Sequence, residues 1–216
     1  MKRIVASFLF FACLQAANVY ADTSPRDIKR VLEDLERTMS GTKTVQTDFV
    51  QEKNLALFNQ KIILKGKVFI QKPRLFSWRV MSPMRYSMVM KGDTISQWDE
   101  DTNQVQQVSL ANNPSFQLAV EQMQKWFYGT FKSMLDEYQI TLITEHPITL
   151  EFVPLVNSAS RNFIKRATIF FQNDEHYIKE VRIEEKDGDS TFLVFINAQL
   201  NQPISPSAWE VRADVR

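Results

Sequence analysis

The feature that most constrains the fold is an alternation of apolar and polar residues that recurs in short segments along most of the chain. A period of two is that of a β-strand with one buried face. Turn-forming pairs such as Lys72-Pro73, Ser82-Pro83, Gly92-Asp93 and Asp187-Gly188 separate many of these segments. Short strands joined by tight turns predict an antiparallel sheet, because parallel strands need long crossover connections.

The alternation predicts about ten or eleven strands. Their expected ranges are 45–50, 62–70, 75–80, 85–90, 94–98, 104–110, 138–143, 149–153, 165–171, 178–185 and 191–196, and residues 207–211 would add a final short strand.

Two stretches follow a helical period instead. The first begins at Ser24, the expected N-cap, and ends at Gly41; its apolar residues are Ile28, Val31, Leu32, Leu35 and Met39. The second spans 115–137 and is broken at Gly129; its apolar stripe contains Phe116, Ala119, Val120, Met123, Trp126 and Phe127, and the shorter segment after the break contains Phe131, Met134 and Leu135. Strands and helices together predict one α+β domain over residues 22–216.

The first 21 residues have the pattern of a secretory signal peptide. Lys2 and Arg3 precede an apolar run at 4–14, and Val19-Tyr20-Ala21 offers a small-residue cleavage site. The run is too short to span the ~30 Å of a bilayer core, which argues against a membrane anchor. We expect cleavage after Ala21 and a periplasmic protein. Lipid attachment at Cys13 is the alternative, but Phe10 and Phe11 fit it poorly.

Charge and cysteine content exclude several classes of function. The formal net charge is +1 for the whole chain and −1 once Lys2 and Arg3 are removed. A nearly neutral protein has little electrostatic attraction for nucleic acid or for an anionic membrane. Cys13 is the only cysteine, so the mature chain could form no disulfide. Sixteen Phe and eight Met make the chain rich in bulky, adaptable apolar side chains.

No motif for catalysis or metal binding is present in the sequence. Its two histidines, His146 and His176, stand in turn-like contexts, and no nucleophile elbow, phosphate loop or dinucleotide fingerprint occurs. The acidic runs at 99–101 and 184–189 fall at strand ends, where solvated charge is the usual explanation. We therefore expect neither an enzyme nor a metal or cofactor site.

The segment 66–80 does suggest a function. In its second strand Phe76, Trp78 and Val80 point to one face, and Met84, Met88 and Met90 follow on the next strand. A wall of Phe, Trp and Met adapts to cargo of variable shape. The same residues could equally form an ordinary core beneath the helices, and the pattern alone leaves both interpretations open.

These residues resemble a known family. Gly66, Lys72-Pro73, Phe76, Trp78, Pro83, Val89 and Gly92-Asp93 are similar to the signature of the LolA family of outer-membrane lipoprotein carriers. The run 49–53 resembles that family's early strand, and the runs 195–197 and 201–204 resemble its closing segment. The resemblance implies an incomplete antiparallel β-barrel around an apolar cavity, with the helices as a lid.

The resemblance also implies site residues. The cavity wall is expected from Phe69, Phe76, Trp78, Val80, Met88, Met90, Trp98, Phe116, Val120, Met123 and Phe127. Phe76 matches a phenylalanine used for cargo transfer, and Lys72 stands where the related carriers place an arginine that holds the lid. Lysine lacks the planar donor fork of arginine, and Ser96 replaces the family's usual tryptophan after the glycine turn. These departures favour a cargo other than a lipoprotein, such as a glycolipid or a polyene-type lipid.

The expected function is a monomeric carrier that takes acylated cargo from an inner-membrane exporter to an outer-membrane acceptor. A periplasmic lipid sensor with the same half-barrel is the alternative, although such sensors usually carry an additional domain for which residues 22–216 leave no room. A hydrolase is disfavoured, because the sequence has no nucleophile–base motif.

Overall fold

The computed structural model describes residues 27–108 and 114–212. Two α-helices lie in these ranges, α1 (Ile28–Ser40) and α2 (Pro114–Tyr128), with short 3-10 helices η2 (Phe131–Met134), η3 (Ala159–Asn162) and η4 (Pro206–Trp209). The strands are β1 (Thr44–Leu55), β2 (Gln60–Gln71), β3 (Leu75–Ser82), β4 (Tyr86–Lys91), β5 (Thr94–Asp99), β6 (Val105–Val108), β7 (Tyr138–Glu145), β8 (Ile148–Pro154), β9 (Ile164–Phe171), β10 (Ile178–Glu185) and β11 (Ser190–Leu200).

The strands form one antiparallel sheet in the order β6-β5-β4-β3-β2-β1-β11-β10-β9-β8-β7. Its two halves meet where β1 pairs with β11, so the beginning and the end of the sheet-forming chain lie side by side. The edge strands β6 and β7 do not pair with each other, and the sheet stays open. The predicted α+β fold, an incomplete barrel with helices over it, is confirmed.

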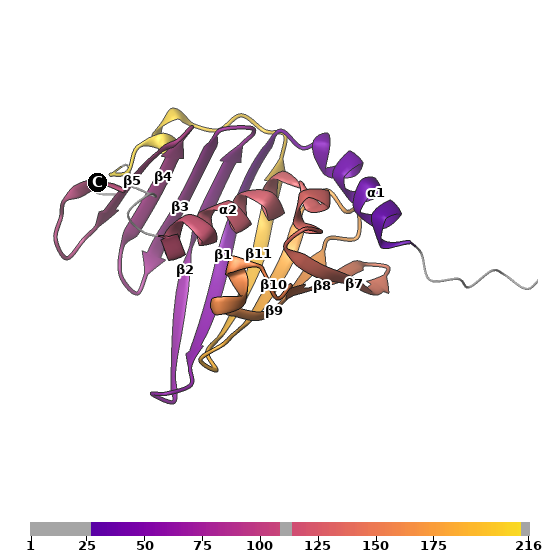
Figure 1. The fold of residues 1–216 in the computed structure, drawn as a ribbon. Coiled ribbons are helices and arrows are strands. Elements are labelled where there is room, and N and C mark those ends of the chain that lie inside the picture. The colour runs from indigo at the N-terminus through magenta and orange to yellow at the C-terminus, as the bar shows by residue number, and fades with distance from the viewer. Residues whose placement is uncertain (1–26, 109–113, 213–216) are drawn as a thin grey trace, which may run out of the picture.

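The sheet curves, and α2 lies across its concave face (Figure 1). Helix α1 lies beside the β7 side of the sheet and packs on η2 and β7. The buried residues of α1, Val31, Leu32, Leu35 and Met39, join the same core as those of the sheet. Both helices therefore bury their apolar stripes against one face, as the helical period predicted.

Gly66 marks the place where β2, β1 and β3 pack most closely. A Cβ atom at this position would lie 1.8 Å from the carbonyl oxygen of Arg79 and 2.7 Å from the ring of Phe49. The pairing of β2 with β3 shifts register between Lys65 and Gly66. The Phe49 ring then contacts Trp78, with 4.2 Å between ring centroids. Only glycine allows this approach, which accounts for Gly66 in the motif.

Two local predictions were wrong. Helix α1 begins at Ile28, and its N-cap is Asp27, whose carboxylate accepts a hydrogen bond from the Lys29 amide at 3.1 Å; Ser24, the expected cap, lies outside the described residues. The expected strand at 207–211 is instead the helix η4 followed by a turn. The Arg79 guanidinium donates to the carbonyl oxygens of Ser207 and Glu210, both at 2.7 Å, and occupies the acceptors that a strand would need.

The hairpin of β1 and β2 is longer than predicted and projects beyond the neighbouring strands (Figure 1). At its tip Leu57 is 87% exposed, and Ile62 and Ile63 are exposed as well. The one-sided alternation that guided the prediction is lost there, because both faces meet solvent. In the described part of the chain, neither helix has the length and apolarity needed to cross a bilayer.

Candidate functional site

A cavity of about 410 Å³ lies between α2 and the concave face of the sheet. Pockets that hold small ligands typically measure about 300–1,000 Å³. Its lining is mainly apolar and comes from both halves of the sheet and from α2: Gln51, Trp78, Leu118, Gln122, Met123, Trp126, Phe127, Phe163, Ile164, Val181, Ile183, Glu185, Thr191 and Leu193.

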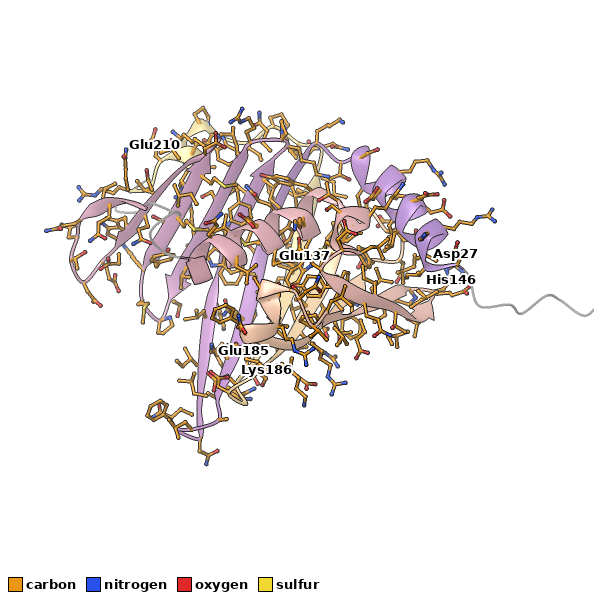
Figure 2. The ribbon with its side chains drawn as sticks, in the orientation of Figure 1. Asp27, Glu137, His146, Glu185, Lys186 and Glu210 are labelled. Atoms are coloured by element: carbon orange, nitrogen blue, oxygen red, sulfur yellow. The ribbon has the colours of Figure 1, made fainter. Side chains whose placement is uncertain are left out.

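Strand register assembles the sheet side of this cavity. Leu193 of β11 pairs with Gln51 of β1 and with Val181 of β10, so these three residues form one row across the sheet. Thr191 and Ile183 form the next row on the same face. Glu185 follows at the end of β10, close to the turn into β11 (Figure 2). The cavity floor is thus a direct product of the pairing of the two chain halves.

Three of the predicted wall residues line the cavity: Trp78 from β3, and Met123 and Phe127 from α2. Others are buried in the core on the same face, outside the cavity lining: Phe76, Val80, Met88, Met90 and Val120. The side chain of Phe116 lies outside the described residues.

Phe69 and Trp98 lie on the opposite, convex face of the sheet. Phe69 pairs with Ser77, and Trp98 pairs with Ser87, one position away from the residues that face α2. The Arg79 guanidinium carbon lies 5.9 Å from the centre of the Phe69 ring on that convex face. These two aromatic residues are therefore separated from the cavity by the sheet itself.

Lys72 joins the C-terminal ends of both helices. Its Nζ donates to the carbonyl oxygen of Met39 in α1 at 2.9 Å and to that of Tyr128 in α2 at 3.1 Å. A cation is favourable at both sites, because helix C-termini carry partial negative charge and unpaired carbonyl groups. Burial outweighs this attraction and, together with the smaller effect of the nearby Lys43, lowers the pKa of Lys72 to about 8.

The two helix ends meet at Gly129, which ends α2 as predicted. Its φ of +73° favours glycine, and a Cβ atom there would lie 2.9 Å from the Cβ of Met39. The amide groups of Gly129 and Thr130 both donate to the Lys125 carbonyl. Lys72 therefore contacts a tight junction at which α1 and α2 already touch.

The sequence analysis missed the half of the cavity formed by β9, β10 and β11. The signal was present, since Val181 and Ile183 alternate with charged residues and Leu193 lies two positions after Thr191. Gln122 was not predicted as a lining residue, because a polar residue in an amphipathic helix is normally expected to face solvent. Gln122 is only 3% exposed.

A lysine forms ion pairs with the acidic turn between β10 and β11. Carboxylate oxygens of Glu185, Asp187 and Asp189 lie within 4.8 Å of one another. Lys53 Nζ lies 3.1 Å from Glu185 Oε1 and 3.6 Å from Asp189 Oδ2. Glu185 also lines the cavity. On that side the cavity is therefore bordered by a carboxylate that is paired with Lys53.

Solved structures with this fold include proteins of very different sequence. A DUF1329 family protein from Desulfovibrio piger superposes with a TM-score of 0.50 at 14% identity, over 85% of this chain and 98% of that chain. MucB in the MucA/MucB complex of Pseudomonas aeruginosa superposes with a TM-score of 0.52 at 10% identity, over 83% of this chain and 60% of that chain. At these identities the similarity concerns the fold alone.

Sequence comparison is more specific. An outer-membrane lipoprotein carrier protein of Coxiella burnetii is 23% identical over 183 residues, covering 82% of this chain and 81% of that protein. The carrier protein of Pseudomonas syringae pv. syringae is 22% identical over 214 residues, covering 97% and 93%. The family described as outer membrane lipoprotein carrier protein LolA matches residues 40–212. The expected resemblance is thus confirmed, and this chain belongs to the LolA family, a family of carriers.

Proposed function

We propose that this protein is a periplasmic carrier that binds the acyl chains of a lipoprotein or of another lipid in the cavity beneath α2. It would take them from an inner-membrane exporter to an outer-membrane acceptor. The observation that carries the proposal is the apolar cavity between α2 and the sheet in a chain of the LolA family.

The physical need for such a cavity is simple. Each CH₂ group exposed to water costs ~0.8 kcal/mol, so a free acyl chain does not cross an aqueous compartment readily. The aromatic and aliphatic side chains of Trp78, Phe127 and Leu193 offer it an apolar surface. The flexible thioether of Met123 adapts to chains of different shape.

The lid is proposed to consist of α2 together with the end of α1, held by Lys72. Cargo reaches the core residues beneath α2 only if that helix moves, so the closed arrangement must be weakly held. Two hydrogen bonds from a lysine Nζ suit this task, since each contributes ~1 kcal/mol net. The cavity wall would then extend on opening to Phe76, Val80, Met88 and Met90 of the sheet and to Val120 of α2, which belong to the same core.

Native mass spectrometry of the protein purified from its own periplasm tests binding and identifies the cargo class. We expect a bound mass that dissociates as an acylated molecule. A transfer assay between donor and acceptor vesicles tests the carrier role: a carrier accelerates movement of the lipid, whereas a sensor binds it without transfer. Protein that carries no lipid and accelerates no transfer would contradict the proposal.

A further inference from the structure

Two polar atoms in the cavity wall have no partner. Gln122 Oε1 and Trp126 Nε1 are buried and form no hydrogen bond with any residue of the described ranges. Their side chains are 3% and 6% exposed, and both residues line the cavity. The great majority of buried polar atoms are hydrogen-bonded, so such a pair in a ligand cavity calls for an explanation.

The orientation of the Gln122 amide is fixed by a neighbour. Its Nε2 donates to Glu137 Oε2 at 2.9 Å, and a carboxylate can only accept. Glu137 also forms an ion pair with Lys125 of α2 and lies in the segment between η2 and β7 (Figure 2). The amide nitrogen therefore faces Glu137, and the carbonyl oxygen is the atom left without a donor.

The two residues lie one turn apart on α2, and their unpaired atoms do not bond to each other. Residues four apart occupy the same face of a helix, one turn from each other. Gln122 Oε1 requires a donor, whereas the indole Nε1–H of Trp126 requires an acceptor. A purely hydrocarbon ligand would leave both unpaired, and an ester, which has acceptors only, would leave Gln122 unpaired.

We propose that Gln122 and Trp126 form a polar recognition site, inside the apolar cavity, for an amide-linked acyl chain. The amide N–H donates to Gln122 Oε1, the amide carbonyl accepts from Trp126 Nε1, and the hydrocarbon lies along Phe127, Met123 and Leu193. This inference rests on the proposed carrier function and narrows its cargo to lipids with an amide near the chain.

The test compares two probes that differ in one group: a pyrene-labelled dodecanoic acid as its N-methyl amide and as its methyl ester. Fluorescence titration of the protein purified from the periplasm should give about tenfold tighter binding of the amide, the effect of one satisfied buried hydrogen bond. Gln122→Met should bring the amide-to-ester affinity ratio close to one, whereas Trp126→Phe, which removes the donor to the carbonyl of both probes, should weaken both affinities and leave the ratio intact. The matched control is Met123→Leu, which should change both affinities together and leave the ratio intact.

The possible outcomes distinguish failure of the recognition site from failure of the proposed carrier function. Equal affinity of the wild-type protein for both probes, a ratio unchanged in Gln122→Met, or affinities unchanged in Trp126→Phe would overturn the recognition site while the carrier cavity stands. Tighter binding of a matching 3-hydroxy ester than of the amide would overturn the assignment to an amide. Failure of both probes to bind would overturn the carrier function and this inference with it.

Discussion

The ring of Phe76 is fully buried between two other aromatic rings. Its centroid lies 6.5 Å from that of Trp78 and 6.1 Å from that of Phe127, so it fills the space between β3 and α2. The family resemblance assigned this position to cargo transfer. In the closed arrangement described here, cargo reaches it only after α2 moves.

Phe76→Glu should therefore destabilise the closed protein. The variant buries an unpaired carboxylate and removes aromatic packing, a loss of several kcal/mol out of the ~5–15 kcal/mol typical of a domain. We expect Tm to fall by on the order of 10 °C in a thermal unfolding experiment.

Leu193→Glu is the matched control, because Leu193 lines the cavity and is partly exposed. It should lose lipid binding with a smaller change in Tm. A near-wild-type Tm for Phe76→Glu would instead place that residue in a wall already open to solvent.

At the scale of elements, periodicity predicted most of the sheet. Strand β9 has one buried face, and its range followed from that alternation. Strand β3 alternates in sequence as well, although Ser77 and Arg79 on its other face are also buried. The ends of β1 and β2 did not, because their outer parts lack a buried face. The sequence located Trp78, Met123 and Phe127 of the cavity lining but not its β10 and β11 part, because alternation identifies a face but not which strands that face shares with α2. The strand order, which places β1 beside β11, decides which strands face α2, and no local sequence pattern reveals that order.

The junction of α1 and α2 gives a prediction about the lid. Lys72→Leu removes two hydrogen bonds to the helix ends, worth ~1 kcal/mol each. Hydrogen exchange in α2 should accelerate severalfold, while exchange in β3 stays unchanged. The control is Lys43→Leu: the exposed Lys43 Nζ donates to the Ser40 carbonyl of α1, and because its charge lowers the Lys72 pKa, its removal should not accelerate exchange in α2. Unchanged exchange in the Lys72 variant would show that this lysine does not hold α2.

The pH dependence of the junction has a definite sign. Burial lowers the pKa of Lys72 from its ordinary 10.5 to about 8, so opening, which exposes the amine, is coupled to proton uptake between these values. The contribution of Lys72 to closure therefore increases as pH rises from 8 to 10.5 and is constant below 8. The Tm difference between wild type and Lys72→Leu should follow that course.

At the scale of the whole molecule, the two faces of the sheet have different covers. The concave face carries α2 and the cavity, while the convex face near β3 and β4 is covered by the last described residues (Figure 1). There Arg79 donates to Ser207 and Glu210, and Ser87 donates to the carbonyl of Val211. This contact connects the C-terminal segment to a motif strand and covers the convex side, on the face of the sheet opposite to α2.

The proposed carrier would have to leave the membrane to take cargo across the periplasm, which makes its N-terminus decisive. The expected signal peptide, residues 1–21, lies outside the described residues, and helix α1 begins only at Ile28. Cleavage after Ala21 would remove the only cysteine and leave a chain without an attachment point. Acylation of Cys13 would instead tether the protein by its lipid chains, since two or more such chains anchor stably.

Intact mass of the protein isolated from the periplasm should correspond to a chain that starts at Asp22, and Tm should be insensitive to reductant because no disulfide is possible. Recovery in the membrane fraction with an acylated Cys13 would contradict a free carrier and favour a membrane-bound acceptor or sensor.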